Sequence, residues 1–380
     1  EYELIIIPEP EETDETESET DSASSVGGEA DFNAQPFIKN KKYLSEDSEE
    51  IVSVAGGSLE YSNTDYVLKG INGLDLIIGR RYKSSSSYEH RAKTGGVGRW
   101  SWIDLIPETY KERRYDIGKG WSFNFPSIKL GDKKENELDV LYLEDGLVYN
   151  IKVNSDETIE LYNHYTNDFV IDLSSDYSNG VVSSKWVLKY KDGIRKYFSD
   201  DGSLIGIQNR YGDKINFVNN KRNNHPYTEI TDTLGRLTVI SGEDIEGGHI
   251  VRVNLPDNIE LKYVVKDTEK SYDALTEYHD PEGNVIDYSY SIRSATVTMG
   301  GLPPKSATTS ACLLSTITFP NGLQTCYSYY GIRVGSLSPT TFRVNCRYDK
   351  IGTSVYNTEN YDYNENEDAW NYGAVTVTNS

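Results

Sequence analysis

The chain has 380 residues, of which 60 are acidic and 38 are basic, and its formal net charge is −22. This charge argues against nucleic acid and anionic membranes as partners, because both attract clustered Lys and Arg side chains. No apolar run approaches the roughly 20 residues that a membrane-spanning helix needs, which argues against membrane insertion.

Two residue types stand out in the composition, with Tyr at 30 positions and Gly at 31. Tyr favours strands because its ring packs on a pleated surface while its hydroxyl reaches water. Few stretches carry the apolar spacing of an amphipathic helix, and Gly, Asn, Asp and Pro supply frequent turns. We therefore expect an all-β fold.

The first 50 residues predict an acidic, disordered tether. Residues 8–35 are rich in Asp, Glu, Ser and Thr and almost lack large apolar side chains. Such a segment cannot bury enough surface to offset the entropy of ordering it. The apolar run in residues 3–12 has no basic start and does not resemble a signal peptide, so we expect any export signal to lie outside this chain.

Residues 51–185 predict a first β region. Apolar side chains alternate with polar ones around residues 59–61 and 74–78, and again from Trp121 to Phe125. A Ser- and Gly-rich stretch at 84–98 predicts a loop between these strands. In residues 139–153 an Asp-Gly pair lies between two apolar runs, which is a strong hairpin signal.

Residues 186–345 predict hairpins that repeat. Two more Asp-Gly pairs end at residues 193 and 202, and later turns follow with a period of about 23–25 residues. The last interval is longer because residues 293–311 predict an inserted loop rich in Gly, Pro, Ser and Thr. The predicted turn residues are Gly193, Gly202, Gly212, Gly235, Asn258, Gly283 and Gly322.

A repeated hairpin has a simple physical purpose. One hairpin is marginal in water, but successive hairpins that join edge to edge share their ladder hydrogen bonds. The resulting sheet keeps one apolar face that must be covered. We therefore expect a continuous antiparallel sheet, with inward side chains such as Leu261, Tyr263, Phe319 and Tyr327 lining or supporting its wall.

Residues 346–380 form an acidic, Tyr-rich segment that we expect to be truncated. Within it, carboxylates and amides alternate as in a calcium loop, at Asp362, Asn364, Asn366 and Asp368. An EF-hand would have Gly where this chain has Glu367, and Glu where it has Gly373. A solvated acidic loop is the favoured interpretation, and a weak calcium site stays open as the alternative.

The sequence offers no recognisable catalytic centre. Its five His residues form no metal-binding motif, and the sequence contains no nucleophile-elbow motif. We therefore expect neither a catalytic residue nor a cofactor. Cys312, Cys326 and Cys346 fit no zinc spacing. They predict ordinary half-buried thiols, and a disulfide between neighbouring strands stays open. We therefore expect a protein that is not an enzyme.

The tryptophans allow two interpretations. They either fill the apolar face of the sheet or stand exposed and stack on sugars, as Trp and Tyr do in carbohydrate-binding modules. The first interpretation predicts a structural role, and the second predicts a carbohydrate-binding or adhesion module. The five are Trp100, Trp102, Trp121, Trp186 and Trp370.

Several sequence motifs of this chain resemble those of Rhs/YD-repeat proteins. The repeats in residues 192–218, 230–240 and 277–290 carry the family's turn followed by an aromatic strand, most clearly in TDTLGRL at 231–237. Residues 56–85, followed by GKGWSFN at 118–124, are similar to the region that precedes the repeats in that family. The resemblance covers roughly residues 54–330.

The resemblance implies a hollow β shell that encloses or displays a downstream, toxin-like domain. It also implies a secreted or cell-surface location, with the rest of its own polypeptide and a passenger domain as partners and cell-surface glycans as a further partner class. In the family, an Asp-Pro-x-Gly motif closes the shell. In this chain the sequence Asp-Pro-x-Gly lies at residues 280–283, inside the repeats, where it predicts an ordinary turn, and no closing motif is evident. We therefore expect a non-enzymatic first part of such a shell, without its cargo.

Overall fold

The computed structural model describes residues 37–39, 48–53, 56–96, 99–106, 114–131, 137–162, 164–267, 273–299, 305–332, 341–363 and 375–379. These residues form antiparallel strands and short 3-10 turns, with no α-helix among them, so the prediction of an all-β fold is confirmed. The acidic stretch 8–35 lies outside the described residues. The prediction of a disordered tether over residues 1–50 was wrong at its end, because the strand Phe37–Lys39 lies before residue 51 and the strand Ser48–Ser53 begins before it. These two strands pair with each other, and Ser48–Ser53 also pairs with the next strand of the chain.

The first sheet, called here the N-terminal sheet, has five described strands in the order β1-β2-β3-β4-β7. The 3-10 turn Ile71–Gly73 joins its two longest strands. The strands are β1 (Phe37–Lys39), β2 (Ser48–Ser53), β3 (Leu59–Leu68), β4 (Leu76–Lys83) and β7 (Trp121–Phe123).

A second, smaller sheet follows in the chain and has the order β11-β10-β9-β8. Gly146, with φ of 84°, supplies the left-handed turn residue between β9 and β10, as the Asp-Gly pair predicts. The strands are β8 (Ser127–Lys129), β9 (Asp139–Tyr142), β10 (Val148–Val153) and β11 (Ile159–Leu161).

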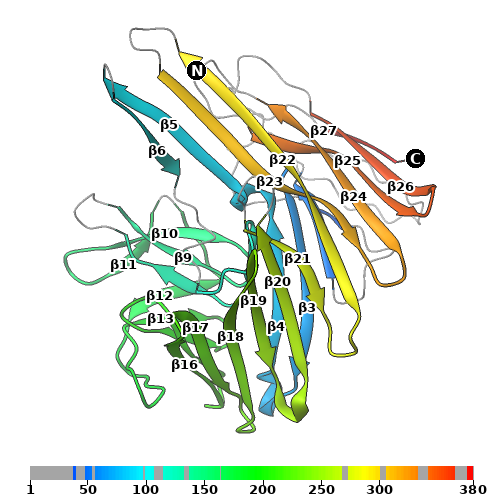
Figure 1. Cartoon of the computed structure of the whole chain (residues 1–380). Helices are drawn as coiled ribbons and strands as arrows, with labels where there is room; N and C mark the ends of the chain where they lie inside the picture. Colours follow the sequence, from blue (N-terminus) through cyan, green and yellow to red (C-terminus); the bar gives the residue numbers. More distant parts are fainter. Residues whose placement is uncertain are drawn as a thin grey trace, which may run out of the picture.

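The third sheet, called here the repeat sheet, is a continuous ladder in which each strand from β12 to β27 pairs with the next (Figure 1). This confirms the predicted sheet of consecutive hairpins. Its strands are β12 (Phe169–Leu173), β13 (Trp186–Tyr190), β14 (Arg195–Phe198), β15 (Leu204–Gln208), β16 (Lys214–Arg222), β17 (His225–Thr231), β18 (Leu237–Ile245), β19 (Gly248–Asn254), β20 (Glu260–Asp267), β21 (Asp273–His279), β22 (Val285–Met299), β23 (Lys305–Thr318), β24 (Leu323–Ile332), β25 (Thr341–Ile351), β26 (Ser354–Tyr363) and β27 (Val375–Asn379).

Two stretches predicted as loops are strands that pair with each other. Residues 84–98 contain β5 (Tyr88–Gly96), which continues through a hairpin into β6 (Arg99–Ile106). Residues 293–311 extend β22 and β23 into a long hairpin instead of forming an inserted loop. β23 pairs through Ser306–Ala311 with β5 and through Thr316–Thr318 with β24, so the sheet branches at this strand. The loop prediction was wrong because β5 and β23, which are distant in the chain, pair with each other in addition to forming their own hairpins.

The predicted turn residues adopt the backbone conformation that their hairpins need. All seven have positive φ, from 59° at Asn258 to 91° at Gly212. At the six glycines the backbone N–H donates to the carbonyl three residues earlier, over 2.9–3.1 Å. This pattern is a type I turn followed by a left-handed residue, a common three-residue hairpin connection. At Asn258 two consecutive residues are left-handed, because Asp257 also has a φ of 62°.

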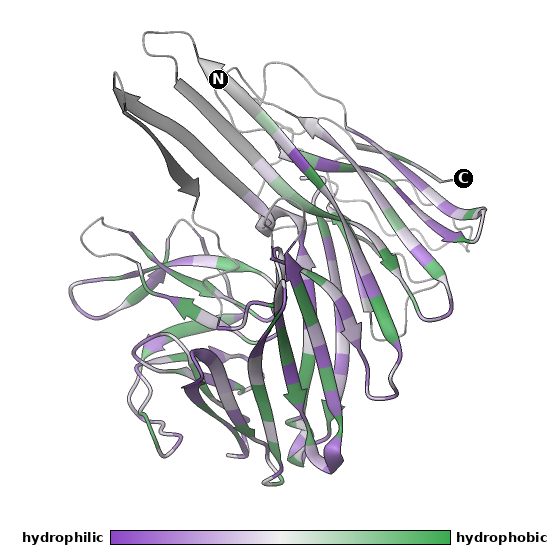
Figure 2. Cartoon of the chain, viewed as in Figure 1, coloured by the Kyte–Doolittle hydropathy of each residue, from purple (hydrophilic) through white to green (hydrophobic). Residues whose placement is uncertain are grey.

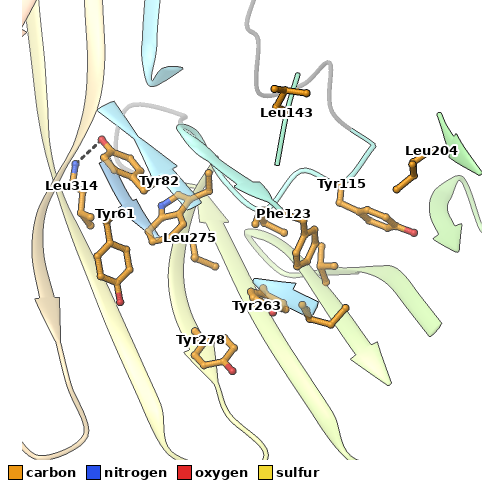
Figure 3. Close-up of a cluster of buried hydrophobic side chains, with 14 of the residues drawn as sticks. Tyr61, Tyr82, Tyr115, Phe123, Leu143, Leu204, Tyr263, Leu275, Tyr278 and Leu314 are labelled. Carbon is orange, nitrogen blue, oxygen red and sulfur yellow. Dashed lines mark hydrogen bonds between the residues drawn. The ribbon is translucent and has the colours of Figure 1, made fainter. Parts of the chain in front are cut away.

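The apolar faces of the sheets meet in one core (Figures 2 and 3). Phe123 of the N-terminal sheet lies edge-on to Tyr263 of β20, with ring centroids 5.0 Å apart. Leu261 and Tyr327 of the repeat sheet are also buried, whereas Phe319 is only half-buried. Over β20–β22 the inner side chains of the repeat sheet therefore pack against a second layer of strands.

Candidate functional site

A buried ion pair joins the N-terminal sheet to the repeat sheet. Asp65 on β3 and Arg80 on β4 form this pair, and neither side chain has solvent-exposed surface. The Tyr263 hydroxyl donates to Asp65 Oδ2 over 2.7 Å, and Arg80 Nε donates to the Tyr288 hydroxyl over 3.0 Å. The guanidinium also lies 3.7 Å from the ring centre of Tyr278. Strands β3, β4, β20, β21 and β22 thus converge on one pair of charges.

A β-bulge in β3 places the carboxylate of this pair. Thr64 pairs with Gly79 and Tyr66 pairs with Ile78, so Asp65 is the extra residue between them. A bulge of this kind re-aims one side chain without ending the strand. Burial alone would lower the pKa of Arg80, but the adjacent Asp65 carboxylate raises it well above its usual range. The guanidinium therefore stays charged inside the core.

A second buried network fastens β2 to β25. Arg347 donates from Nε and Nη2 to the two carboxylate oxygens of Glu50, over 3.0 and 3.1 Å. Its Nη1 donates to Asp349 Oδ2 over 2.7 Å. A two-pronged contact of this kind fixes orientation as well as charge. Both networks act as structural connections between sheets, because their ion pairs join residues of different strands away from solvent. One atom of the first network, Arg80 Nη2, is buried without a hydrogen-bond partner among the described residues.

A pocket of about 330 Å³ lies beside β7, the edge strand of the N-terminal sheet. It forms where the chain leaves β7 and runs through residues 123–128 across the inner face of strands β15–β18. Its apolar lining comes from both sides, and the rings of Phe125 and Phe217 meet edge-on at 5.5 Å. The apolar residues of the lining are Tyr115, Phe123, Phe125, Pro126, Ile128, Leu204, Phe217, Pro226 and Ile240.

Hydrogen bonds hold one polar wall of this pocket in place. Arg114 donates from Nε to Thr228 Oγ1 over 2.9 Å and from Nη2 to the carbonyl oxygen of Asn220 over 2.6 Å. The Tyr115 hydroxyl lies 2.5 Å from Thr228 Oγ1, and that oxygen lies 2.9 Å from Asn219 Oδ1. Burial raises the pKa of Tyr115, so its hydroxyl stays neutral. The polar groups of this wall are therefore held in place by contacts within the chain.

The mouth of the pocket carries three charged groups, Arg114, Asp201 and Lys221. Burial alone would raise the pKa of Asp201, but hydrogen bonds from Ser199 and Ser203 and the charge of Arg114 lower it. In the described part of the chain, no acceptor pairs with the exposed Lys221 ammonium. The mouth therefore has an excess of positive charge in a chain whose formal net charge is −22.

The residues predicted from the sequence are distributed along the fold and do not form one site. Of the seven turn residues, only Gly202 lines the pocket. Asp362 lies in β26 opposite Thr376, whereas Asn364, Asn366 and Asp368 lie outside the described residues. Within the described ranges, no group of His, Cys, Asp and Glu side chains is arranged to hold a metal ion.

The described tryptophans fill the core. Trp121 and Trp186 are each 2% exposed, and Trp121 Nε1 donates to the Tyr290 hydroxyl over 2.8 Å. The side chains of Trp100, Trp102 and Trp370 lie outside the described part. The large exposed aromatic side chains that the structure does describe are Tyr162, Tyr165, Tyr211 and Tyr356.

Sequence reasoning missed both the buried ion pair and the pocket. Asp65 interrupts the alternation of β3, and a charge inside an alternating run is the local signal that could have pointed to a bulge. Arg114 and Lys221 belong to no motif and meet only because residues 114–128 cross strands β15–β18. No local pattern encodes that crossing.

No family model matches this chain, and no curated protein is significantly similar to it. Among solved structures, it is similar to the N-terminal domain of effector protein SpvB from Salmonella typhimurium strain LT2. That match has 12% sequence identity, covers 83% of this chain and 99% of that chain, and has a TM-score of 0.23. A TM-score this low carries no conclusion about fold or function. Within the described ranges, no helix has the length and apolarity needed to cross a membrane.

Proposed function

We propose that this chain is a non-enzymatic structural segment of a secreted or cell-surface β shell of the Rhs/YD-repeat type. In this role it encloses or displays a downstream, toxin-like domain of the same polypeptide. The observation that supports the proposal is the unbroken antiparallel ladder from β12 to β27, in which each hairpin provides the ladder partner of the next. A sheet built in this way can be extended by further hairpins, because each new strand pairs with the edge strand before it.

The N-terminal sheet strengthens this interpretation. It covers the inner face of the repeat sheet and is fastened there by the buried Asp65–Arg80 and Glu50–Arg347 pairs. Tyr82 adds a direct connection, because its hydroxyl accepts a hydrogen bond from the backbone N–H of Leu314 over 2.9 Å. Such contacts favour a rigid wall, since breaking one partner of a buried pair is strongly destabilising.

A carbohydrate-binding or adhesion module is the second candidate. The observation that favours it is the exposure of Tyr162 and Tyr165, which are 47% and 81% exposed and close in sequence beside β11. Exposed aromatic rings can stack on sugar faces. Among the side chains that the structure describes, Trp121 and Trp186 are buried, so the exposed aromatic candidates there are tyrosines.

Protease protection tests the shell in the natural polypeptide that contains this chain. Proteinase K should spare the downstream domain while the β region is folded, and should digest the same domain when it is produced alone. Equal digestion in the two cases would refute the shell. A glycan array tests the rival role, because saturable binding that Tyr165→Ala abolishes would favour an adhesion module.

A further inference from the structure

The pocket beside Arg114 has the size and construction of a ligand site. Its volume of about 330 Å³ lies at the lower end of the range for small-molecule sites. Such sites combine a mainly apolar lining with a few oriented polar groups, and this pocket has both. It contains no group from the buried ion pairs, so the connections between the sheets do not use it.

The apolar part of the pocket favours a flat or branched hydrophobic body. Phe125 and Phe217 meet edge-on at 5.5 Å, and Phe123 lies 6.2 Å from Phe125 between ring centroids. An aromatic guest can add edge-to-face contacts to such a group, each worth about 0.5–1.5 kcal/mol beyond the burial of area.

The charges at the mouth select the sign of the ligand. Arg114 is held by Thr228 and Asn220, so its positive charge is fixed at the wall. Asp201 is engaged by Ser199 and Ser203, over 2.5 and 3.0 Å. Lys221 can therefore form an ion pair with a ligand, because its ammonium group has no acceptor among the described residues. An anionic group that enters the mouth gains a charge-assisted contact.

We propose that this pocket binds a small organic anion that joins one aromatic or branched apolar body to one carboxylate group. The body lies among Phe123, Phe125 and Phe217, and the carboxylate lies at the mouth near Lys221. This binding role does not depend on the proposed shell, because it requires only the folded chain. Added salt should weaken binding, because it screens the attraction between the carboxylate and Lys221.

Calorimetric titration of the full chain with 3-phenylpropionate tests the proposal. We expect saturable binding with a stoichiometry of one that weakens as salt is added. Acetate lacks the apolar body and 3-phenylpropanamide lacks the charge, so each should bind about five-fold more weakly or worse. Equal binding of the amide would overturn the anionic part of the proposal, and equal binding of acetate would overturn the apolar part.

Two variants locate the site. Lys221→Glu reverses the exposed charge and should weaken 3-phenylpropionate about five-fold or more. The matched control Lys191→Glu changes an exposed lysine outside the pocket and should leave the affinity unchanged. Ser203→Trp places a large ring in the lining and should abolish binding while the melting temperature stays close to that of the parent. The proposal fails if no saturable binding occurs, or if both pocket variants bind like the parent.

Discussion

Asp65 and Arg80 form an ion pair that has no contact with solvent, and they lie on the adjacent strands β3 and β4. The pair lies between the N-terminal sheet and the repeat sheet, and tyrosines from β20, β21 and β22 complete it. Because a buried charge without a partner is costly, the two sheets depend on each other through this contact.

Replacing Arg80 with Met should destabilise the chain by about 3–5 kcal/mol, because it leaves the Asp65 carboxylate buried without its partner. The free energy of urea unfolding measures the effect. The double variant Asp65→Leu with Arg80→Met should lose less than the sum of the single losses. As a control, Lys69→Gln breaks the surface pair with Asp75, whose lysine is 81% exposed, and should cost at most about 1 kcal/mol. Equal losses at the two sites would contradict this account.

Stability should fall as the pH rises from about 4 through about 6. Burial, the hydrogen bond with Asp267 and the charge of Asp116 raise the pKa of Asp273 from 3.8 to about 6, while the charge of His249 acts in the opposite direction. A raised native pKa means that the folded chain holds this proton more tightly than the unfolded chain. Its stabilising contribution is therefore complete below about pH 4 and is lost as the pH rises through about 6.

Asp273→Asn tests this dependence, because the amide cannot ionise. The variant should melt higher than the parent above about pH 6, and its melting temperature should change less between about pH 4 and pH 6. Asp287→Asn removes an exposed carboxylate on β22 and serves as the control. A parent chain whose melting temperature rises steadily between about pH 4 and pH 8 would exclude this role for Asp273.

Two glycines in equivalent turns should differ sharply in their tolerance of a side chain. Gly202 and Gly283 have φ of 80° and 85°. A Cβ at Gly202 would lie 1.9 Å from the carbonyl oxygen of Ile128, whereas nothing lies within 4 Å of one at Gly283. Gly283→Ala should cost about 1–2 kcal/mol for the left-handed backbone alone. Gly202→Ala should cost about 1–3 kcal/mol more through the clash, measured by urea unfolding. Equal costs would show that β8 does not contact this turn in solution.

The three cysteines should remain thiols. Cys312 and Cys326 are buried, and burial together with the neighbouring Cys326 raises the pKa of the Cys346 thiol. Ellman's reagent should therefore react slowly with the folded chain at about pH 7, since the thiolate is the reactive form. All three thiols should react in guanidinium chloride. A count of one thiol in the unreduced, unfolded chain would reveal a disulfide and contradict the prediction.

The hairpins could be predicted because their information is local. Asp192 and Gly193 set a turn through their own backbone preferences, and the residues around them alternate with a period of two. Strands that follow one another then pair, as β13 and β14 do. The same reasoning failed at residues 84–98 and 293–311, where composition indicates loops. Their strands depend on the pairing of β5 with β23, which no local sequence pattern predicts.

The sequence by itself determined an all-β chain, the positions of its turns and the pairing of each hairpin with the next, because these depend on neighbouring residues. Only the tertiary structure decided that the N-terminal strands cover the repeat sheet, that Asp65 turns inward at a bulge, and that Arg114 and Lys221 share the mouth of a pocket. These features depend on side chains that are distant in the chain and meet only after the sheets pack, so their energies cannot be read from any one segment.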